Sequence, residues 1–130
     1  MHVNIDFNSD EAIYIQLRNQ IIYCIATARL QEGDTLPSVR ELADYVGINM
    51  HTVNKAYSIL RQEGYVKLDR RKGAVIAIDY NKLKALQDLK EELRVILAEA
   101  FCKNITCREA HEVVDQVFNE FERGRSHVVR

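Results

Sequence analysis

The sequence predicts a mainly α-helical fold with a small β-wing, in which an N-terminal winged helix-turn-helix is followed by a two-helix dimerisation hairpin. Residues 36–57, LPSVRELADYVGINMHTVNKAY, have the pattern of two short helices joined by a tight turn. The apolar residues after them change to the pattern of a β-hairpin with a charged tip. Residues 82–123 then carry two long apolar stripes at helical spacing.

Length and composition indicate a globular chain without a membrane span. The 130 residues suit one ordinary domain or two small ones, and 47% of them are apolar. No apolar segment approaches the roughly 20 residues of a transmembrane helix. The start, MHVNIDFNSD, lacks the basic and apolar regions of a signal peptide. Three cysteines without framework spacing favour reduced thiols, so a cytoplasmic protein is expected.

The first helix is expected after a short lead-in at residues 1–8. Ser9 or Asp10 can cap it, and its apolar stripe predicts that it runs to about Arg29. Cys24 lies on this stripe and is most simply a small buried apolar residue. A loop at residues 30–36 follows.

The next two helices form the predicted helix-turn-helix. Ser38 and Glu41 have the spacing of a capping box at the start of the first helix. Gly47 stands where a left-handed C-cap belongs, and Asn49 can cap the second helix. The exposed start of that second helix can reach base edges and phosphates in duplex DNA. Its residues are Asn49, Met50, His51, Thr52, Asn54 and Lys55.

A charged hairpin follows the second helix. Residues 65–68 and 74–78 are strand-like and rich in β-branched residues. The tip between them carries Arg70, Arg71, Lys72 and Gly73, which suit the phosphate backbone or an adjacent minor groove. Residues 35–78 hold seven cations and four anions, a net charge of +3, whereas the whole chain carries −1. A solvated turn is the alternative interpretation of the tip.

Two further helices are expected at residues 82–103 and 107–123. Thr106 and Glu109 form a second capping box, and Gly124 is expected to end the last helix before a frayed tail, RSHVVR. Both helices carry more apolar residues than a two-helix hairpin can bury, so a second copy of the chain is expected to cover them. Packing onto the first helix of the same chain is the alternative. The expected dimerisation residues are Leu86, Leu89, Leu93, Ile96, Leu97, Phe101, Val113, Val117, Phe118 and Phe121.

Residues 11–78 resemble the GntR family of bacterial transcription regulators. The resemblance rests on the block LPSVRELA at residues 36–43 and on Thr52-Val53 followed by Ala56-Tyr57. The short two-helix tail resembles the YtrA-type subfamily, which lacks the large effector-binding domains of other GntR groups. The resemblance implies that Arg40 contacts DNA. Ser38, at the same helix start, is also predicted to contact DNA. It also implies that residues 49–55 read bases and that residues 70–73 meet the minor groove.

Base preference does not transfer with this resemblance. Many family members carry a basic residue where Met50 or Asn54 stands, and many wings show Gly-x-Gly-Thr where this chain has Arg71-Lys72-Gly73-Ala74. The resulting prediction is a homodimeric repressor, with domains at residues 9–78 and 79–130. Its partners would be a near-palindromic double-stranded DNA operator, a second copy and an unidentified small-molecule effector. No membrane, metal or other cofactor is expected.

The alternative from another class is a small-molecule, metal or thiol-redox sensor that uses the C-terminal helices. Its candidate ligands are His2, His51, His111, His127, Cys102 and Cys107, none of which form a close metal-binding spacing. Cys102 and Cys107 flank the turn between the last two helices. An enzyme is not expected, because the sequence has no nucleophile–base set and no phosphate-binding glycine loop. A dimeric adaptor that binds protein is a third interpretation.

Overall fold

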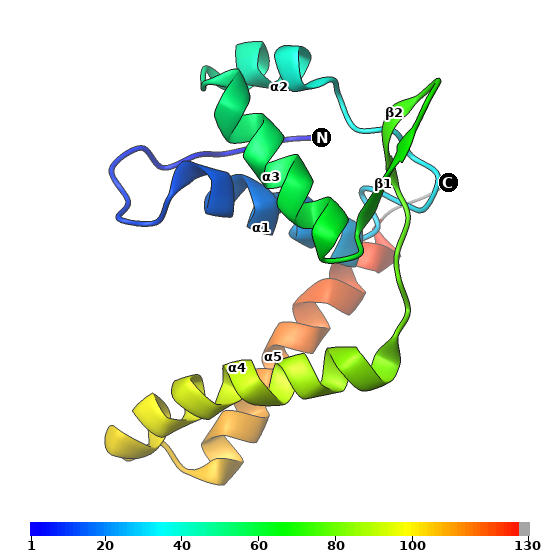
Figure 1. The fold of residues 1–130 in the computed structure, drawn as a ribbon. Coiled ribbons are helices and arrows are strands. Elements are labelled where there is room, and N and C mark those ends of the chain that lie inside the picture. Colours follow the sequence, from blue (N-terminus) through cyan, green and yellow to red (C-terminus); the bar gives the residue numbers. More distant parts are fainter. Residues whose placement is uncertain (128–130) are drawn as a thin grey trace. The chain divides into compact units, whose positions relative to one another are not determined.

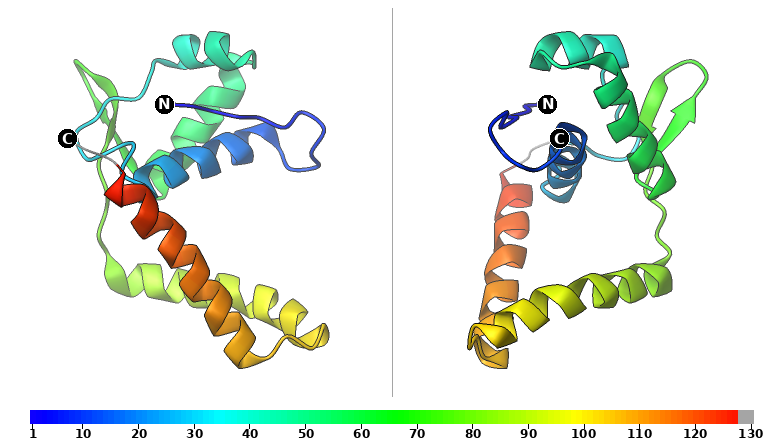
Figure 2. Two further views of the ribbon diagram at one scale, coloured as in Figure 1. Left: turned by 180° about the vertical axis from the view of Figure 1, so that it is seen from behind. Right: turned by 60° about the vertical axis from the view of Figure 1, so that its left-hand side comes forward.

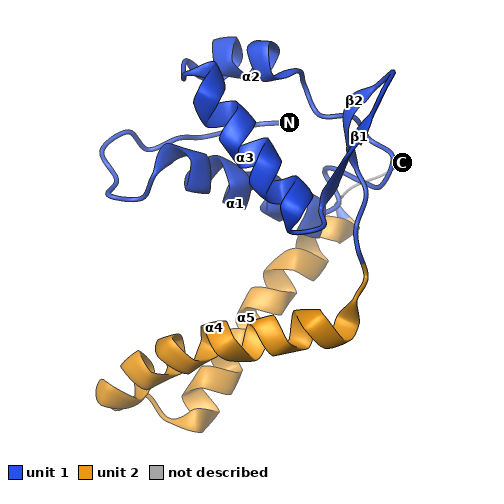
Figure 3. Ribbon diagram, in the orientation of Figure 1, with its two compact units in different colours: residues 1–79, 127–130 blue, residues 80–126 orange. Residues whose placement is uncertain are grey.

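The computed structural model describes residues 1–127, and it divides the chain into two compact units (Figures 1 and 3). The first unit is formed by Met1–Asp79 and the second by Tyr80–Ser126. The helices and strands, in order, are α1 (Ile13–Ala26), α2 (Val39–Val46), α3 (Met50–Gln62), β1 (Val66–Asp69), β2 (Gly73–Ile76), α4 (Lys82–Cys102) and α5 (Cys107–Ser126). The predicted fold class, mainly α with a small β-wing, is confirmed.

The core of the first unit is built around α3. Helices α1 and α2 and strand β1 each pack against it, and α3 itself buries four side chains. Every buried apolar residue of the described chain belongs to this unit. These residues are Leu17, Ile21, Cys24, Leu30, Leu36, Leu42, Ala43, Val53, Ala56, Tyr57, Leu60, Val66, Ala74 and Ile76. Burial of the Cys24 thiol raises its pKa, in agreement with the expectation that it is a buried apolar side chain.

The caps predicted for the helix-turn-helix are confirmed. The Glu41 backbone N–H donates to Ser38 Oγ at 3.1 Å, and the Ser38 N–H donates to Glu41 Oε1 at 3.3 Å. Gly47 ends α2 with φ of 80°, a left-handed conformation that glycine adopts without steric cost. The side chain of Asn49 accepts from the His51 N–H at 2.7 Å and starts α3.

Helix α1 is shorter than the sequence predicted. The expected cap at Ser9 or Asp10 is wrong, since Ser9 Oγ accepts from the Glu11 N–H in a turn and the N-cap, Ala12, has no side-chain bond. The expected end at Arg29 is also wrong, because Ala28 adopts φ of 61° and breaks the helical path. A left-handed alanine is uncommon, so this end of the helix could not be predicted from the residue types.

The lead-in is an arm held against α1 by glutamine side chains. Gln16 Oε1 accepts from the Asp6 N–H at 2.9 Å, and Gln16 Nε2 donates to the backbone oxygens of Asp6 and Glu11. One turn further along, Gln20 pairs in the same way with the backbone of Asn4. The buried amide of Gln16 is therefore fully hydrogen-bonded, as a buried polar group must be.

Strands β1 and β2 form an antiparallel hairpin, the predicted wing. Val66 pairs with Ile76 and Asp69 with Gly73. The loop before α2 adds to its edge, because the Leu36 N–H donates to the Ala74 oxygen at 2.8 Å and the Ile76 N–H donates to the Asp34 oxygen at 2.8 Å. Hydrogen bonds thus connect the wing directly to the segment that leads into α2.

The second unit contains two helices that leave most of their residues exposed. Neither α4 nor α5 has a buried residue. They separate from the turn that joins them and make almost no contact along their lengths (Figures 1 and 2). Both predicted helices are present, but they are splayed instead of packed as a closed hairpin.

The turn and end of the second unit follow the sequence only in part. The predicted capping box is confirmed, since the Glu109 N–H donates to Thr106 Oγ1 at 3.1 Å and the Thr106 N–H donates to Glu109 Oε1 at 2.9 Å. The expected stop at Gly124 is wrong, because α5 continues to Ser126. Glycine costs a helix only about 1 kcal/mol relative to alanine, so it does not by itself end one. The expected fraying of the tail falls partly on residues 128–130, outside the described residues.

Candidate nucleic-acid interface

The start of α3 presents a row of exposed polar and flexible side chains. Asn49, Met50, His51 and Asn54 are exposed, while Thr52 is half-buried. Val53, Ala56 and Tyr57 lie on the buried face of the same helix, so the face that carries these polar residues stays clear of the core. Amide, hydroxyl and imidazole groups are suited to hydrogen-bond base edges, and the Met50 side chain can contact a thymine methyl group.

Arg40 lies on α2, two residues beyond the capped Ser38. Its side chain is exposed, so its guanidinium is available to an incoming phosphate. The Ser38 hydroxyl accepts the Glu41 N–H as part of the cap and retains a hydrogen to donate. The cap therefore orients the helix start that carries both of these predicted DNA contacts.

A hydrogen bond from α3 fixes the loop before α2. Tyr57 is buried on α3, and its hydroxyl donates to the Pro37 oxygen at 2.8 Å. Burial, with a smaller effect of the Glu41 carboxylate, raises the pKa of this phenol well above its ordinary value, so it stays a hydrogen-bond donor. This bond, which the sequence did not reveal, joins α3 to the loop that leads into α2.

The wing tip is organised by a single carboxylate. Asp69 Oδ1 accepts from the backbone N–H groups of Arg71 and Lys72, at 2.8 Å and 3.0 Å. The pKa of Asp69 is lowered, first by the hydrogen bond from Lys72 and then by that from Arg71. Gly73 closes the turn with φ of 80°, and Arg70, Arg71 and Lys72 are all exposed. Three cations therefore stand on a hairpin that packs against α3 through β1.

Lys55 was predicted to contact DNA, and the structure places it against another side chain. Its Nζ lies over the ring of Tyr14, 4.0 Å from the ring centroid. The sequence offered no sign of this pair, because its partners are far apart in the chain and meet only through the packing of α1 on α3.

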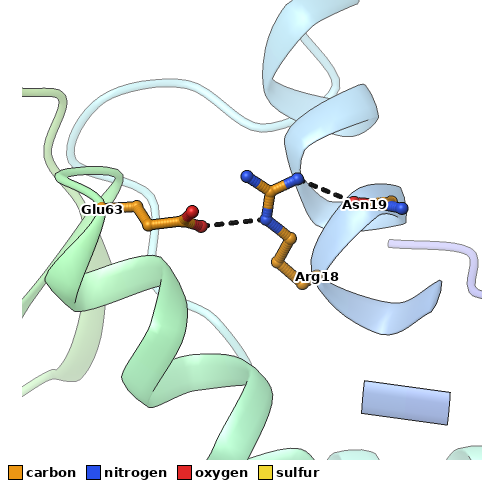
Figure 4. Close-up of polar contacts among 3 residues, drawn as sticks. All are labelled: Arg18, Asn19 and Glu63. Atoms are coloured by element: carbon orange, nitrogen blue, oxygen red, sulfur yellow. Dashed lines mark hydrogen bonds and ion pairs between the residues drawn. The ribbon is translucent and has the colours of Figure 1, made fainter. Parts of the chain in front are cut away.

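A second link joins α1 to the C-terminal end of α3. Arg18 Nε donates to Glu63 Oε1 at 2.9 Å, and the same guanidinium donates to Asn19 Oδ1 at 2.7 Å (Figure 4). Glu63 is the C-cap residue of α3. Helix α1 therefore contacts α3 through these two side-chain pairs as well as through the core.

The groups considered for sensing are dispersed. Among residues 1–127, no three histidine, cysteine or acidic side chains gather into a group that could hold a metal ion. Cys102 and Cys107 are exposed free thiols at the two sides of the turn between α4 and α5. The helices of the described chain are also too short or too polar to span a bilayer.

Comparison with known proteins places this architecture in a family. The family described as bacterial regulatory proteins, gntR family, matches residues 10–76. The transcriptional repressor YtrA of Bacillus subtilis is 29% identical over 126 residues, which cover 95% of this chain and 97% of that protein.

Solved structures give the same result. YtrA from Sulfolobus acidocaldarius, a GntR-family transcription factor, is 37% identical with a TM-score of 0.57 and coverage of 91% and 97% of the two chains. A transcriptional antiterminator from Listeria monocytogenes is 27% identical with a TM-score of 0.82 and coverage of 93% and 92%. The winged helix-turn-helix and the two-helix tail thus occur together in these relatives, and the chain belongs to the GntR family of bacterial transcription regulators, in its YtrA-type group.

Proposed function

We propose that this regulator is a homodimeric repressor that binds a near-palindromic operator. Residues 9–78 would bind the duplex, and residues 79–130 would hold two copies together. The observation that carries the proposal is the contrast in burial between the two units. The first unit buries its apolar residues and exposes a polar and cationic face, whereas the second exposes long apolar side chains.

The DNA-binding part of the proposal divides the exposed residues by chemistry. Arg40 and the wing cations Arg70–Lys72 would neutralise phosphates, which fixes position and gives salt-dependent affinity. Asn49, His51, Thr52 and Asn54 would supply most of the base discrimination from the major groove. An asparagine amide such as that of Asn54 is suited to pair with adenine.

The dimer part follows from what α4 and α5 leave exposed. Leu83 is 78% exposed and Phe101 is 82% exposed, which leaves these large apolar side chains in water. On α4, four leucines line a groove of about 340 Å³ together with Lys90 and Arg94. A second copy supplies an equally apolar pair of helices, and a symmetric pairing closes without leaving an open surface.

The near-palindrome follows from the symmetry of such a dimer. Two recognition helices related by a two-fold axis would enter major grooves about 34 Å apart, one helical turn of DNA. Each half-site would then repeat the other in inverted order. The repressor role is supported by the name of the B. subtilis relative, a transcriptional repressor similar over 95% of this chain.

The test is selection of bound duplexes from random DNA with the purified full chain, followed by sedimentation of the complex. We expect an inverted repeat with half-site centres about 10 base pairs apart and two chains for each duplex. A single half-site bound by one chain would refute the dimer. No enrichment, even at low salt, would refute DNA binding. Placing the selected operator over a promoter should lower transcription in the presence of the protein, and an increase would reverse the repressor assignment.

A further inference from the structure

The side chain of Lys55, on α3, is held in place by a residue of α1. Its backbone lies on the exposed side of α3, but its ammonium sits 4.0 Å from the centroid of the Tyr14 ring. A cation over an aromatic face is attracted by the quadrupole of the ring. The ammonium is thus held at one place by a residue of the neighbouring helix.

The Tyr14 ring is a fixed platform. Tyr14 is half-buried and packs against the core cluster of the first unit. It belongs to the first turn of α1, the helix that packs most extensively on α3. No carboxylate of residues 1–127 forms an ion pair with Lys55, so its full positive charge remains available to an anion.

This arrangement lowers the entropic cost of gripping a phosphate. A free lysine side chain carries about 2 kcal/mol of rotamer entropy, part of which is lost when its ammonium is confined. The ring already confines the Lys55 ammonium before DNA arrives, and the contact uses only one side of a group with three donors. A phosphate can therefore bind the remaining donors while the ring contact is kept.

We propose that Tyr14 is a positioning residue for DNA binding, which acts by holding the Lys55 ammonium ready for a backbone phosphate. The inference rests on the proposed role of Lys55 at the DNA interface and extends it to α1. Tyr14 lies outside the helix-turn-helix and the wing, the elements that sequence reasoning assigned to DNA.

The experiment is a double-mutant cycle on duplex binding by the full chain. The variants are Tyr14→Leu, Lys55→Met and the two combined. The probe is a mixed-sequence duplex of about 30 base pairs, long enough for two half-sites one helical turn apart, titrated at several KCl concentrations. Circular dichroism melting checks that each variant is folded.

Three results are expected from this cycle. Lys55→Met lowers affinity and reduces the slope of log affinity against log salt by about 0.9 for each chain that contacts DNA. Tyr14→Leu lowers affinity by about 2–5-fold, the range of an exposed cation–π contact, and leaves the salt slope in place. Tyr14→Leu has no further effect once Lys55→Met is present. A further variant outside the cycle, Tyr14→Phe, keeps the ring face and should bind as tightly as the unaltered chain.

The matched control is Glu63→Gln, which removes the charge from the Arg18 ion pair between α1 and the end of α3 without touching Lys55. Its effect on affinity should be the same with and without Lys55→Met, so its coupling to Lys55 should be zero.

Three outcomes would overturn the inference. An equal loss from Tyr14→Leu in both backgrounds would make Tyr14 a structural residue only. A gain in affinity would show that the ring withholds the ammonium from DNA. An unchanged affinity for Lys55→Met would remove Lys55 from the interface and leave the proposed function resting on Arg40 and the wing. Failure of the unaltered chain to bind this duplex would instead refute the proposed function itself.

Discussion

The two units of this chain use apolar residues in opposite ways. In the first unit, Leu17, Ile21, Val53 and Leu60 are each completely removed from solvent. In the second, no residue of α4 or α5 is buried. A helix with an apolar stripe must bury it against something, because propensity alone stabilises an isolated helix only marginally. The first unit therefore buries its apolar residues within one chain, while the second leaves its apolar stripes uncovered, as the proposed dimer requires.

The largest effect is expected from a charge placed on the α4 stripe. Leu93→Glu would put a carboxylate into the proposed interface once from each copy, and burying an unpaired charge is costly enough to prevent association. We expect the dimer dissociation constant to rise by more than about 100-fold, or about 2.7 kcal/mol. Analytical ultracentrifugation measures it.

Val95→Glu is the matched control for Leu93→Glu. Val95 is apolar and 64% exposed, and it lies two residues along α4, about 200° around the helix from Leu93. It should leave the dimer intact. If both variants remain dimers, the leucine stripe is not the interface, and the contrast between the units needs another explanation.

The next largest effect is expected on stability, from a cavity in the core of the first unit. Leu60 is 0% exposed on α3, so Leu60→Ala leaves a cavity and should destabilise the first unit by about 2–5 kcal/mol. Leu83→Ala removes the same atoms from a side chain that is 78% exposed, and it should change the stability of the first unit by less than about 0.5 kcal/mol. Urea unfolding followed by circular dichroism compares the two. Equal effects would contradict the division into a buried and an open unit.

A smaller effect is expected when one arginine is removed, and it should appear in DNA binding only when that arginine lies in the first unit. Arg40→Ala removes one proposed phosphate contact, which should lower affinity roughly 5–10-fold at about 0.1 M salt for every sequence alike and make the salt slope shallower. Arg108→Ala removes the same charge from an exposed position on α5 and should leave the slope unchanged. Titrations at several salt concentrations measure both, and an unchanged slope for Arg40→Ala would remove Arg40 from the backbone role.

The features that could be predicted from the sequence are local ones. Ser38 with Glu41, Gly47 and Thr106 with Glu109 are caps whose partners lie within a few residues, and the structure contains each of them. The wing could be located in the same way, because the spacing of apolar residues changes from a helical to a strand pattern within a few residues. Local chemistry thus located most of the elements of both units.

The features that were missed depend on contacts distant in sequence. Gln16 clamps the arm, and Lys55 lies over Tyr14, because α1 and the arm fold back onto elements that only the tertiary structure brings near. The end of α1 was missed because Ala28 adopts a conformation that its residue type disfavours. For the candidate site, sequence supplied the exposed residues of α3 and the wing tip, and their roles in binding stay predictions.

The two capping boxes allow the same change in each unit. Ser38→Ala and Thr106→Ala each remove one cap, which is worth about 1 kcal/mol. In the first unit, α2 packs on α3, so the loss should lower the midpoint of cooperative unfolding. In the second unit, the start of α5 has no buried side chain, so the loss should appear as local fraying in amide hydrogen exchange. A cooperative loss from both variants would mean that the units unfold together.

The smallest effect is a pH dependence at the start of α5. Hydrogen bonds from the Thr106 backbone N–H and then from its side chain lower the pKa of Glu109 below its ordinary value of 4.5. A lowered folded-state pKa stabilises the cap above pH 4.5, and this contribution is lost as the pH falls through the folded value. Protection of the first α5 amides should therefore decline on acidification below pH 4.5.

Glu109→Gln should abolish this decline, because the amide does not titrate. Glu112→Gln removes an exposed carboxylate that lies outside the cap on the same helix, and it should leave the decline in place. Amide exchange measured by nuclear magnetic resonance between pH 3 and 6, a range that brackets ordinary glutamate titration, distinguishes the variants. The decline should be confined to the first turn, since the rest of α5 depends on the apolar cover of its stripe. A decline that extends along the whole helix would show that the cap, and not a second copy of the chain, keeps the second unit folded.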